Sequence, residues 1–377
     1  MAPPGKKEAV MRFDINSIKD DEKAVFGLRT LFQSYGYTLY KMSKFEEYDL
    51  YVRNKDFLVS NEIITFTDTT GKLMALKPDV TLSIIKNTQD IPGAIQKVCY
   101  SENVYRVAKG SGLFTEILQT GLECIGSIGR YEIIETLTLA VKSLEMISPS
   151  YVLDISYLDI LTALLGSCGI PAEAREELTE AIGSKNASET QGILERYGVG
   201  EMEKKCLADI ISIYGPVAEV LPKLDALCIN ESVEKAVDEF RGICALLIES
   251  GCAEKINIDF SIINDMKYYN GVVFKGYIEG IPVSILSGGQ YDGMMKLIGR
   301  SSGAIGFAVY LDFLESLSAP GSEYDADTLI IYDDSTDLKE LMKQTEKLRE
   351  EGSVLVEKAV PEGIKYRRLV RLDGKGE

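Results

Sequence analysis

The feature that most constrains the fold of this chain is a long hairpin predicted over residues 95–126. Two apolar-rich segments, 98–107 and 116–126, flank a loop that contains glycine. β-branched and aromatic residues favour strands, and glycine permits the turn between them. Gln119 and Glu123 are four residues apart on the second strand, so both side chains project from the same face. They are either the solvated face of an edge strand or part of a pocket.

The remaining segments place helices and further hairpins around this one. Apolar spacing predicts a helix over 20–36, and a turn at 68–71 joins strands over 62–67 and 72–76. A helix over 130–147 and a strand over 151–155 follow, and residues 157–250 are almost wholly helical. We expect one domain over 1–320, with the helical insertion at about 157–250, and a short α/β fragment over 325–377. In that fragment the pattern predicts strands over 328–332 and 354–356 and a helix over 338–351, and a basic cluster from Lys365 to Arg371 is predicted to be a solvated tail.

Composition limits the class of protein. The 377 residues are 45% apolar and 26% charged, which is typical of a soluble globular protein with an ample core. No stretch approaches eighteen apolar residues, so no membrane span is indicated. The seven cysteines are scattered and contain no Cys-x-x-Cys, which favours reduced thiols in the cytoplasm.

The chain contains no histidine, which excludes zinc sites with histidine ligands, Ser-His and Cys-His nucleophiles and a histidine general base. The net charge is −17, and residues 171–255 hold 17 Asp and Glu against 9 Lys and Arg. Binding of phosphates relies on clustered Lys and Arg. The balance therefore argues against a large nucleic-acid interface.

Two short segments carry candidate binding residues. In Leu-Lys-Pro-Asp-Val-Thr, at 76–81, the proline fixes a bend from strand to helix, and Asp79 or Thr81 could cap that helix. Tyr268 and Tyr269 precede the turn-prone pair Asn270-Gly271. Neighbouring residues on a strand point to opposite faces, so only one tyrosine need face a pocket. An ordinary strand and turn is the alternative.

A hairpin strand is expected over 282–286, followed by Gly288-Gly289-Gln290-Tyr291-Asp292, where the glycines permit tight turning and close backbone approach. Together with 303–314 and the segments above, this order of motifs resembles class II aminoacyl-tRNA synthetases of the histidyl type over residues 10–318. The resemblance implies an α+β fold, in which helices flank an antiparallel sheet, and a C-terminal fragment similar to a truncated anticodon-binding domain. It also implies a histidine pocket lined by Asp79, Thr81, Arg106, Gln119, Glu123, Tyr268 and Tyr269.

The chain departs from the synthetase pattern where arginines engage the nucleotide. Attack of a carboxylate on ATP needs cations around the phosphates, and removing one well-placed donor typically costs about 3 kcal/mol. Arg106 is kept, but a glycine of the third motif is Tyr310, and the arginine positions of the loop, the tyrosine segment and the third motif hold Leu113, Thr115, Asn264 and Phe313. Gln290 replaces a further arginine of the family signature, in the Gly-Gly-Gln-Tyr-Asp segment. We therefore expect synthetase activity to be lost.

A kept amino-acid pocket beside a lost nucleotide site resembles the regulatory subunits of ATP phosphoribosyltransferase. The resemblance implies a cytoplasmic, non-catalytic protein with no cofactor, metal or nucleic acid of its own. Its expected partner is the short-form catalytic subunit, with which a homodimer of this chain would form a hetero-octamer in histidine biosynthesis, and L-histidine is the expected feedback effector. The alternatives are an active histidyl-tRNA synthetase and a stand-alone amino-acid-binding paralogue.

Overall fold

The computed structural model describes residues 18–52, 63–91, 93–107, 112–263, 266, 268–316 and 324–372. The chain divides into two compact units, Met1–Leu317 and Ser318–Glu377. Within the described ranges, every helix is too short or too polar to cross a lipid bilayer.

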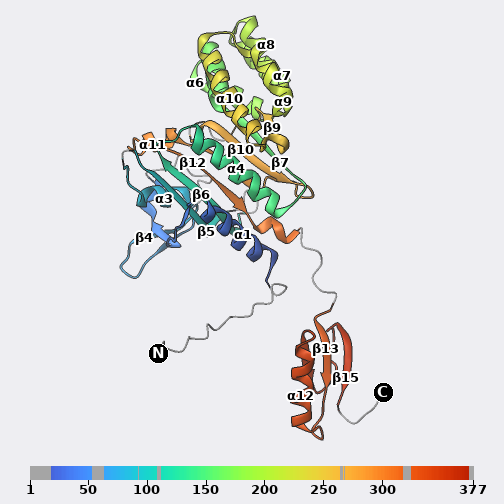
Figure 1. The fold of residues 1–377 in the computed structure, drawn as a ribbon. Coiled ribbons are helices and arrows are strands. Elements are labelled where there is room, and N and C mark those ends of the chain that lie inside the picture. The colour runs from blue at the N-terminus through green and yellow to red at the C-terminus, as the bar shows by residue number, and fades with distance from the viewer. Residues whose placement is uncertain are drawn as a thin grey trace, which may run out of the picture. The chain divides into compact units, whose positions relative to one another are not determined.

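The first unit is built on a nine-stranded sheet that is antiparallel across its six central strands (Figure 1). Two parallel pairings, β1 with β5 and β7 with β9, extend it on either side. In order across the sheet, the strands are β1 (Thr38–Leu39), β5 (Ile95–Val107), β6 (Phe114–Gly126), β12 (Gly303–Tyr310), β11 (Leu286–Gln290), β10 (Asn270–Ile278), β7 (Tyr151–Tyr157), β9 (Ile256–Asp259) and β8 (Tyr214–Pro216). The predicted hairpin is thus β5–β6, and the α+β fold is confirmed.

Helices α1 (Asp20–Ser34) and α4 (Arg130–Ile147) pack on one face of this sheet (Figure 1). Phe32 of α1 meets Phe307 of β12 edge to face, with ring centroids 5.8 Å apart. The period-2 alternation of β6 divides its side chains between the two faces. Leu122 and Cys124 are buried in the core that contains α1 and α4, whereas Gln119 and Glu123 belong to the other face.

A smaller sheet, β2-β4-β3, precedes the helix that carries the first candidate residues. Its strands are β2 (Phe45–Glu47), β3 (Thr65–Thr67) and β4 (Leu73–Leu76), with the short helix α2 (Tyr48–Val52) after β2 and helix α3 (Thr81–Asn87) after β4. Asp68 closes the predicted turn between β3 and β4, because its Oδ1 accepts hydrogen bonds from the backbone N–H groups of Thr70 and Lys72.

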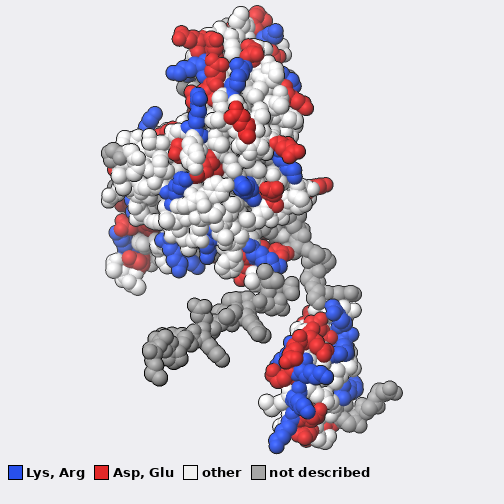
Figure 2. Space-filling model, in the orientation of Figure 1, with Lys and Arg blue, Asp and Glu red and all other residues white. Residues whose placement is uncertain are grey.

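The buried side chains of the helical insertion, among them Leu178, Leu207 and Val237, belong to the same hydrophobic core as the residues between the sheet and helices α1 and α4. Its helices are α5 (Leu158–Ser167), α6 (Ala172–Gly183), α7 (Ala187–Arg196), α8 (Glu201–Ser212), α9 (Val217–Val220), η3 (Leu221–Leu227) and α10 (Glu231–Glu249), and η4 (Ala253–Lys255) leads into β9. Strand β8 interrupts this helical run and pairs with β9. On the face shown in Figure 2, acidic and basic side chains are interspersed over the insertion.

Two predictions near the end of the first unit are wrong in detail. Residues 282–284 are a loop, and the strand is Leu286–Gln290, so Gly288 and Gly289 lie inside a strand and not in a turn. Close approach is the reason for glycine there. A Cβ on Gly288 would clash with the backbone of β12, and one on Gly289 would lie 2.7 Å from the ring of Tyr269. Helix α11 (Asp292–Leu297) and η5 (Asp312–Ser316) complete this unit.

The second unit is a three-stranded parallel sheet, β14-β13-β15, with one helix. Its elements are β13 (Ala326–Ile331), α12 (Leu338–Arg349), β14 (Val354–Glu357) and β15 (Tyr366–Arg371). The predicted solvated tail is wrong, because Arg367, Arg368 and Arg371 belong to β15. That strand pairs with the buried β13 along its whole length.

Candidate functional site

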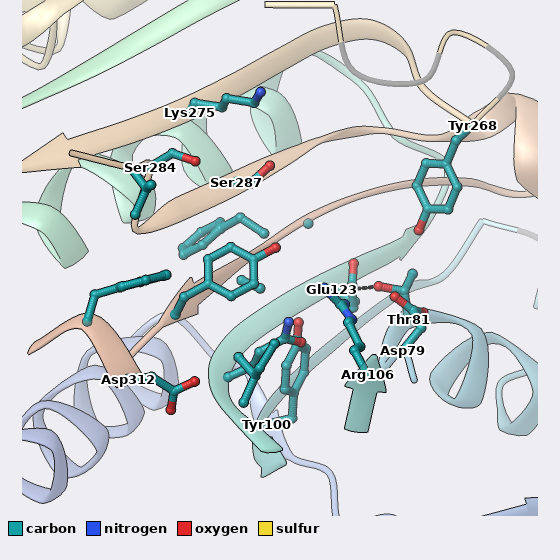
Figure 3. A pocket seen from close by; sticks show the side chains of 18 of the residues that line it. Asp79, Thr81, Tyr100, Arg106, Glu123, Tyr268, Lys275, Ser284, Ser287 and Asp312 are labelled. Carbon is teal, nitrogen blue, oxygen red and sulfur yellow. Dashed lines mark hydrogen bonds between the residues drawn. The ribbon is translucent and has the colours of Figure 1, made fainter. Parts of the chain in front are cut away.

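A pocket of about 880 Å³ opens on the sheet face opposite α1 and α4. All seven residues of the predicted histidine site line it, although they come from the β4–α3 loop, the first residue of α3, β5, β6 and the segment before β10. Figure 3 shows Asp79, Thr81, Arg106 and Glu123 together at one end, with Tyr268 opposite them. The fold therefore gathers into one cavity residues that the sequence separates by up to 190 positions, from Asp79 to Tyr269.

Glu123 lies at the centre of this end and is 2% exposed. The Thr81 hydroxyl lies 2.7 Å from its Oε1, and the Tyr291 hydroxyl lies 2.5 Å from its Oε2. Gly306 lies opposite Glu123 in the β6–β12 register, and any Cβ at that position would collide with the carboxylate. Burial raises the pKa of Glu123 to about 8, although the Thr81 and Tyr291 hydroxyls oppose the rise. The unliganded site therefore holds a proton on Glu123 at neutral pH.

Asp79 ties the pocket to helix α3. Its Oδ1 accepts a hydrogen bond of 2.9 Å from the backbone N–H of Leu82, in the first turn of the helix, so the predicted capping role is confirmed for Asp79. Burial raises the pKa of Asp79, and the backbone N–H of Leu82 and the Arg106 guanidinium partly offset this rise. A ligand cation beside the two carboxylates would stabilise the ionised form of both.

The loop that carries Asp79 is fixed by a buried ion pair. Lys77 is fully buried, and its Nζ lies 3.0 Å from Oε2 of Glu102 on β5. Its backbone N–H donates to the Lys44 carbonyl, and its carbonyl accepts from the Tyr105 N–H. Burial lowers the pKa of Lys77, and Glu102 opposes that shift. Because breaking a buried pair is strongly destabilising, this contact holds the loop in one conformation.

Arg106 is oriented from the same loop, since its Nε donates a hydrogen bond of 2.9 Å to the Pro78 carbonyl. Tyr310, the last residue of β12, also lines the pocket, and the Arg106 guanidinium opposes the rise that burial gives to the pKa of Tyr310. Arg106 and Lys275 are the two cationic side chains among the described residues that line the pocket, against the four carboxylates of Asp79, Glu116, Glu123 and Asp312. The pocket as a whole therefore favours a cationic group.

Tyrosines form most of the remaining wall of this end. The Tyr268 ring lies 4.4 Å from Tyr269 and 5.6 Å from Tyr291, measured between centroids. The expectation that only one of the adjacent tyrosines need face a pocket does not apply here. Strand β10 begins at Asn270, so the alternation of a strand does not apply to either residue, and both line the cavity. Burial raises the pKa of Tyr100, Tyr268, Tyr269 and Tyr291 well above 10, which keeps their hydroxyls as neutral donors.

The other end of the pocket has a different character. Figure 3 places Lys275, Ser284 and Ser287 together there, away from Arg106. Val283 and Phe313 add partly exposed apolar surface at 41% and 40% exposure. Leu113, which precedes the pocket residue Thr115 by two positions, is 67% exposed. Gln290 stands where the synthetase signature has an arginine. Its Nε2 donates a hydrogen bond of 2.7 Å to Oδ2 of Asp292 and so joins β11 to α11. Asn264 lies outside the described residues.

Sequence reasoning did not assign Tyr100, Lys275, Tyr291 or Tyr310 to the pocket. Lys275 lies opposite Ser287 in the β10–β11 register, which no residue spacing along the chain indicates. A signal existed for two of the four. Tyr291 stands inside the Gly-Gly-Gln-Tyr-Asp segment, and Tyr310 stands where the resembling motif has glycine.

A family model described as histidyl-tRNA synthetase matches residues 15–314. The chain belongs to the histidyl-tRNA synthetase family. Among solved structures, this family member is similar to an ATP phosphoribosyltransferase regulatory subunit/histidyl-tRNA synthetase from Bacillus halodurans, with a TM-score of 0.75 and 21% identity over 99% of this chain and 100% of the other. A chain of the ATP phosphoribosyltransferase (HisG:HisZ) complex from Thermotoga maritima matches with a TM-score of 0.61 and 20% identity, over 78% and 98% of the two chains.

In sequence, this histidyl-tRNA synthetase family member is 28% identical over 338 residues to the ATP phosphoribosyltransferase regulatory subunit of Clostridium kluyveri. The match covers 87% of this chain and 86% of that protein. The resemblance inferred from the sequence, to these regulatory subunits within a histidyl-tRNA synthetase-like fold, is confirmed by the comparisons.

Proposed function

We propose that this chain is a non-catalytic regulatory subunit of ATP phosphoribosyltransferase that binds L-histidine in the pocket described above. The observation that carries the proposal is that the pocket keeps residues suited to an amino acid but lacks arginines suited to a nucleotide. Glu123 is buried and Asp79 is half-buried beside hydroxyl donors and one arginine, while Leu113, Thr115 and Phe313 stand where the synthetase pattern has arginines that engage the nucleotide.

The acidic end of the pocket, formed by Asp79, Thr81, Arg106, Glu123 and Tyr268, suits a zwitterion with a polar ring. Asp79 and Glu123 offer carboxylates for the ammonium group or a ring N–H, the tyrosine hydroxyls can donate to a ring nitrogen, and Arg106 offers a cation for the carboxylate. Binding of a cationic group next to Glu123 would favour its ionised form, so we expect histidine binding to release a proton.

The proposed partner is the short-form catalytic subunit of ATP phosphoribosyltransferase, in a hetero-octamer that contains homodimers of this chain, in the cytoplasm. The names of the relatives support the regulatory role, and the Thermotoga maritima protein comes from a complex of this enzyme. Feedback requires histidine to bind one state of the assembly better than another, and such couplings are typically about 1–3 kcal/mol.

Co-expression with a short-form catalytic subunit tests the proposal. We expect the two chains to co-purify, this chain to raise the turnover of the catalytic subunit, and L-histidine to inhibit the mixture. The matched mixture made with Glu123→Gln should keep its turnover and lose its inhibition. Failure to co-purify would favour a stand-alone paralogue, and histidine-dependent exchange of pyrophosphate into ATP would favour a working synthetase.

A further inference from the structure

Arg300 and Asp90 form an ion pair outside the pocket. Nε of Arg300 lies 2.6 Å from Oδ1 of Asp90, and the two side chains are 15% and 27% exposed. The Asp90 carboxylate also accepts hydrogen bonds from the Ser302 hydroxyl and from the N–H and hydroxyl of Ser301. The Ser302 hydroxyl, the Ser301 N–H and Arg300 hold the pKa of Asp90 below its ordinary value, so its carboxylate is ionised at neutral pH. We call these four residues the Arg300 clamp.

The Arg300 clamp holds the C-terminal end of helix α3. Nη1 of Arg300 donates hydrogen bonds of 3.0 Å to the carbonyls of Ile85, in the last turn, and Thr88, the residue after the helix. Carbonyls at this end of a helix lack the usual partner four residues on, and a cation beside them is favoured by the helix dipole. Helix α3 has only seven residues, and so short a helix depends on tertiary contacts. Its position is therefore set by what binds its two ends.

The N-terminal ends of α3 and α11 both reach Glu123. Thr81 is the first residue of α3, and its hydroxyl lies 2.7 Å from Oε1 of Glu123. Tyr291 is the residue before α11, and its hydroxyl lies 2.5 Å from Oε2. Arg300 follows α11 by three residues, and its backbone N–H donates a hydrogen bond of 2.8 Å to the Met295 carbonyl of that helix. The Arg300 clamp therefore joins the C-terminal ends of the same two helices whose N-terminal ends contact Glu123.

Helices α3 and α11 also share a buried apolar cluster. It contains three side chains of α3 and two of α11, together with two tyrosines that line the pocket, namely Leu82, Ile84, Ile85, Met294, Met295, Tyr268 and Tyr291. The two side chains from α11 are methionines, which are flexible, adapt to gaps and specify a packing geometry weakly. Hydrogen bonds are directional, so the Arg300 clamp fixes the relative position of the two helices more sharply than this packing does.

We propose that the Arg300 clamp positions the Thr81 and Tyr291 hydroxyls around Glu123 from outside the cavity and thereby sets the affinity of the pocket for its amino-acid ligand. The inference rests on the proposed amino-acid-binding function. Among the described residues, those that line the pocket do not include the clamp residues, so the clamp acts through the two helices and not on the ligand. Release of the clamp leaves the C-terminal ends of α3 and α11 free to separate, and a hydrogen bond weakens steeply when its donor leaves the preferred geometry.

Calorimetric titration of the full chain with L-histidine at pH 8, repeated in buffers of different ionisation enthalpy, tests the inference. It measures the affinity and the number of protons released per bound ligand. We expect Arg300→Gln to weaken L-histidine binding by on the order of tenfold. The number of protons released should rise, because the pKa of Glu123 increases when the two hydroxyls that oppose its rise move away, and more Glu123 is then protonated before binding.

Two further variants and a control sharpen the test. Asp90→Asn should give the same two changes, and it keeps the arginine if Arg300→Gln fails to fold. In the double variant the losses should not add, because the two side chains act as one unit. Arg196→Gln is the matched control, since it breaks an ion pair with Glu177 on the insertion and should change neither the affinity nor the proton count.

A weaker affinity with an unchanged proton count would give the Arg300 clamp a merely structural role and overturn the inference. Unchanged affinity in both Arg300→Gln and Asp90→Asn would overturn it as well, and wild-type binding of L-histidine in the same titrations would leave the proposed function standing. A wild-type chain that does not bind L-histidine would refute both.

Discussion

The two ends of the pocket differ in how their polar groups are satisfied. At the acidic end, formed by Asp79, Thr81, Arg106, Glu123 and Tyr268, Glu123 is buried, Asp79 is half-buried, and both carboxyl groups accept hydrogen bonds. At the apolar end, formed by Lys275, Val283, Ser284, Ser287 and Phe313, apolar side chains are partly exposed and Lys275 has no ion pair among the described residues. A buried carboxylate with a raised pKa destabilises the fold, so its retention indicates a ligand whose charge compensates it.

The largest expected effect is on the pH dependence of stability, and it comes from Glu123 at the acidic end. The pKa of Glu123 is about 8 in the folded protein against 4.5 for an unperturbed glutamate. The destabilisation caused by ionising this buried carboxyl is therefore absent below pH 4.5, grows as the pH rises from 4.5 to 8, and is complete above pH 8. Replacing Glu123 by Gln removes this destabilisation, because glutamine does not ionise. We expect the stability of wild type relative to Glu123→Gln to fall by up to about 5 kcal/mol between pH 4.5 and pH 9, measured by urea unfolding. Parallel pH profiles for the two proteins would contradict a buried titrating carboxylate.

The second largest effect on stability is expected from the buried ion pair between Lys77 and Glu102. Lys77→Met leaves the Glu102 carboxylate without its buried partner, and we expect the free energy of unfolding to drop by about 3–5 kcal/mol. The matched control is Lys86→Met, which removes the exposed partner of Glu46 and should lower stability by about 1 kcal/mol or less. Similar losses in urea unfolding for the two lysines would show that the Asp79 loop is not held by this pair.

A matched pair of glutamates compares two carboxylates of the pocket by their effect on affinity. Glu123→Gln should weaken L-histidine binding by about 100-fold, because a buried charge that faces the ligand is lost. Glu116→Gln changes a carboxylate of the same pocket whose Oε1 is already bonded by Asn103 and by the Tyr105 hydroxyl, and it should have a much smaller effect. Calorimetry at pH 8 measures both. If Glu116→Gln had the larger effect, the ligand would contact Glu116 and not the buried Glu123.

The smallest effect is expected from the apolar end itself. Val283 is 41% exposed, so Val283→Ala removes little buried surface, and surface substitutions usually change free energies by less than about 0.5 kcal/mol. L-histidine affinity should therefore change by no more than about twofold. A larger loss in the same titration would extend the ligand site across the whole cavity.

Local pattern predicted most of the helices and strands, because these depend on short-range rules, whereas the seven site residues follow from the resemblance to histidyl-type synthetases. The predicted helix over 130–147 is α4, and all seven site residues line one cavity. The features that sequence reasoning missed depend on pairing between strands that are distant in the chain. β15 resembles a solvated tail because Arg367 and Arg368 alternate poorly with apolar residues, and only pairing with buried β13 makes it a strand. Lys275 likewise enters the pocket through its register with β11, which its own neighbours do not encode.

The central claim is that the acidic end binds an amino acid while the other end no longer binds a nucleotide. Calorimetric titration of the full chain with L-histidine, and separately with ATP and Mg²⁺, tests it most directly. The account predicts saturable heat with L-histidine and none with ATP. Binding of ATP with no heat from L-histidine would contradict it.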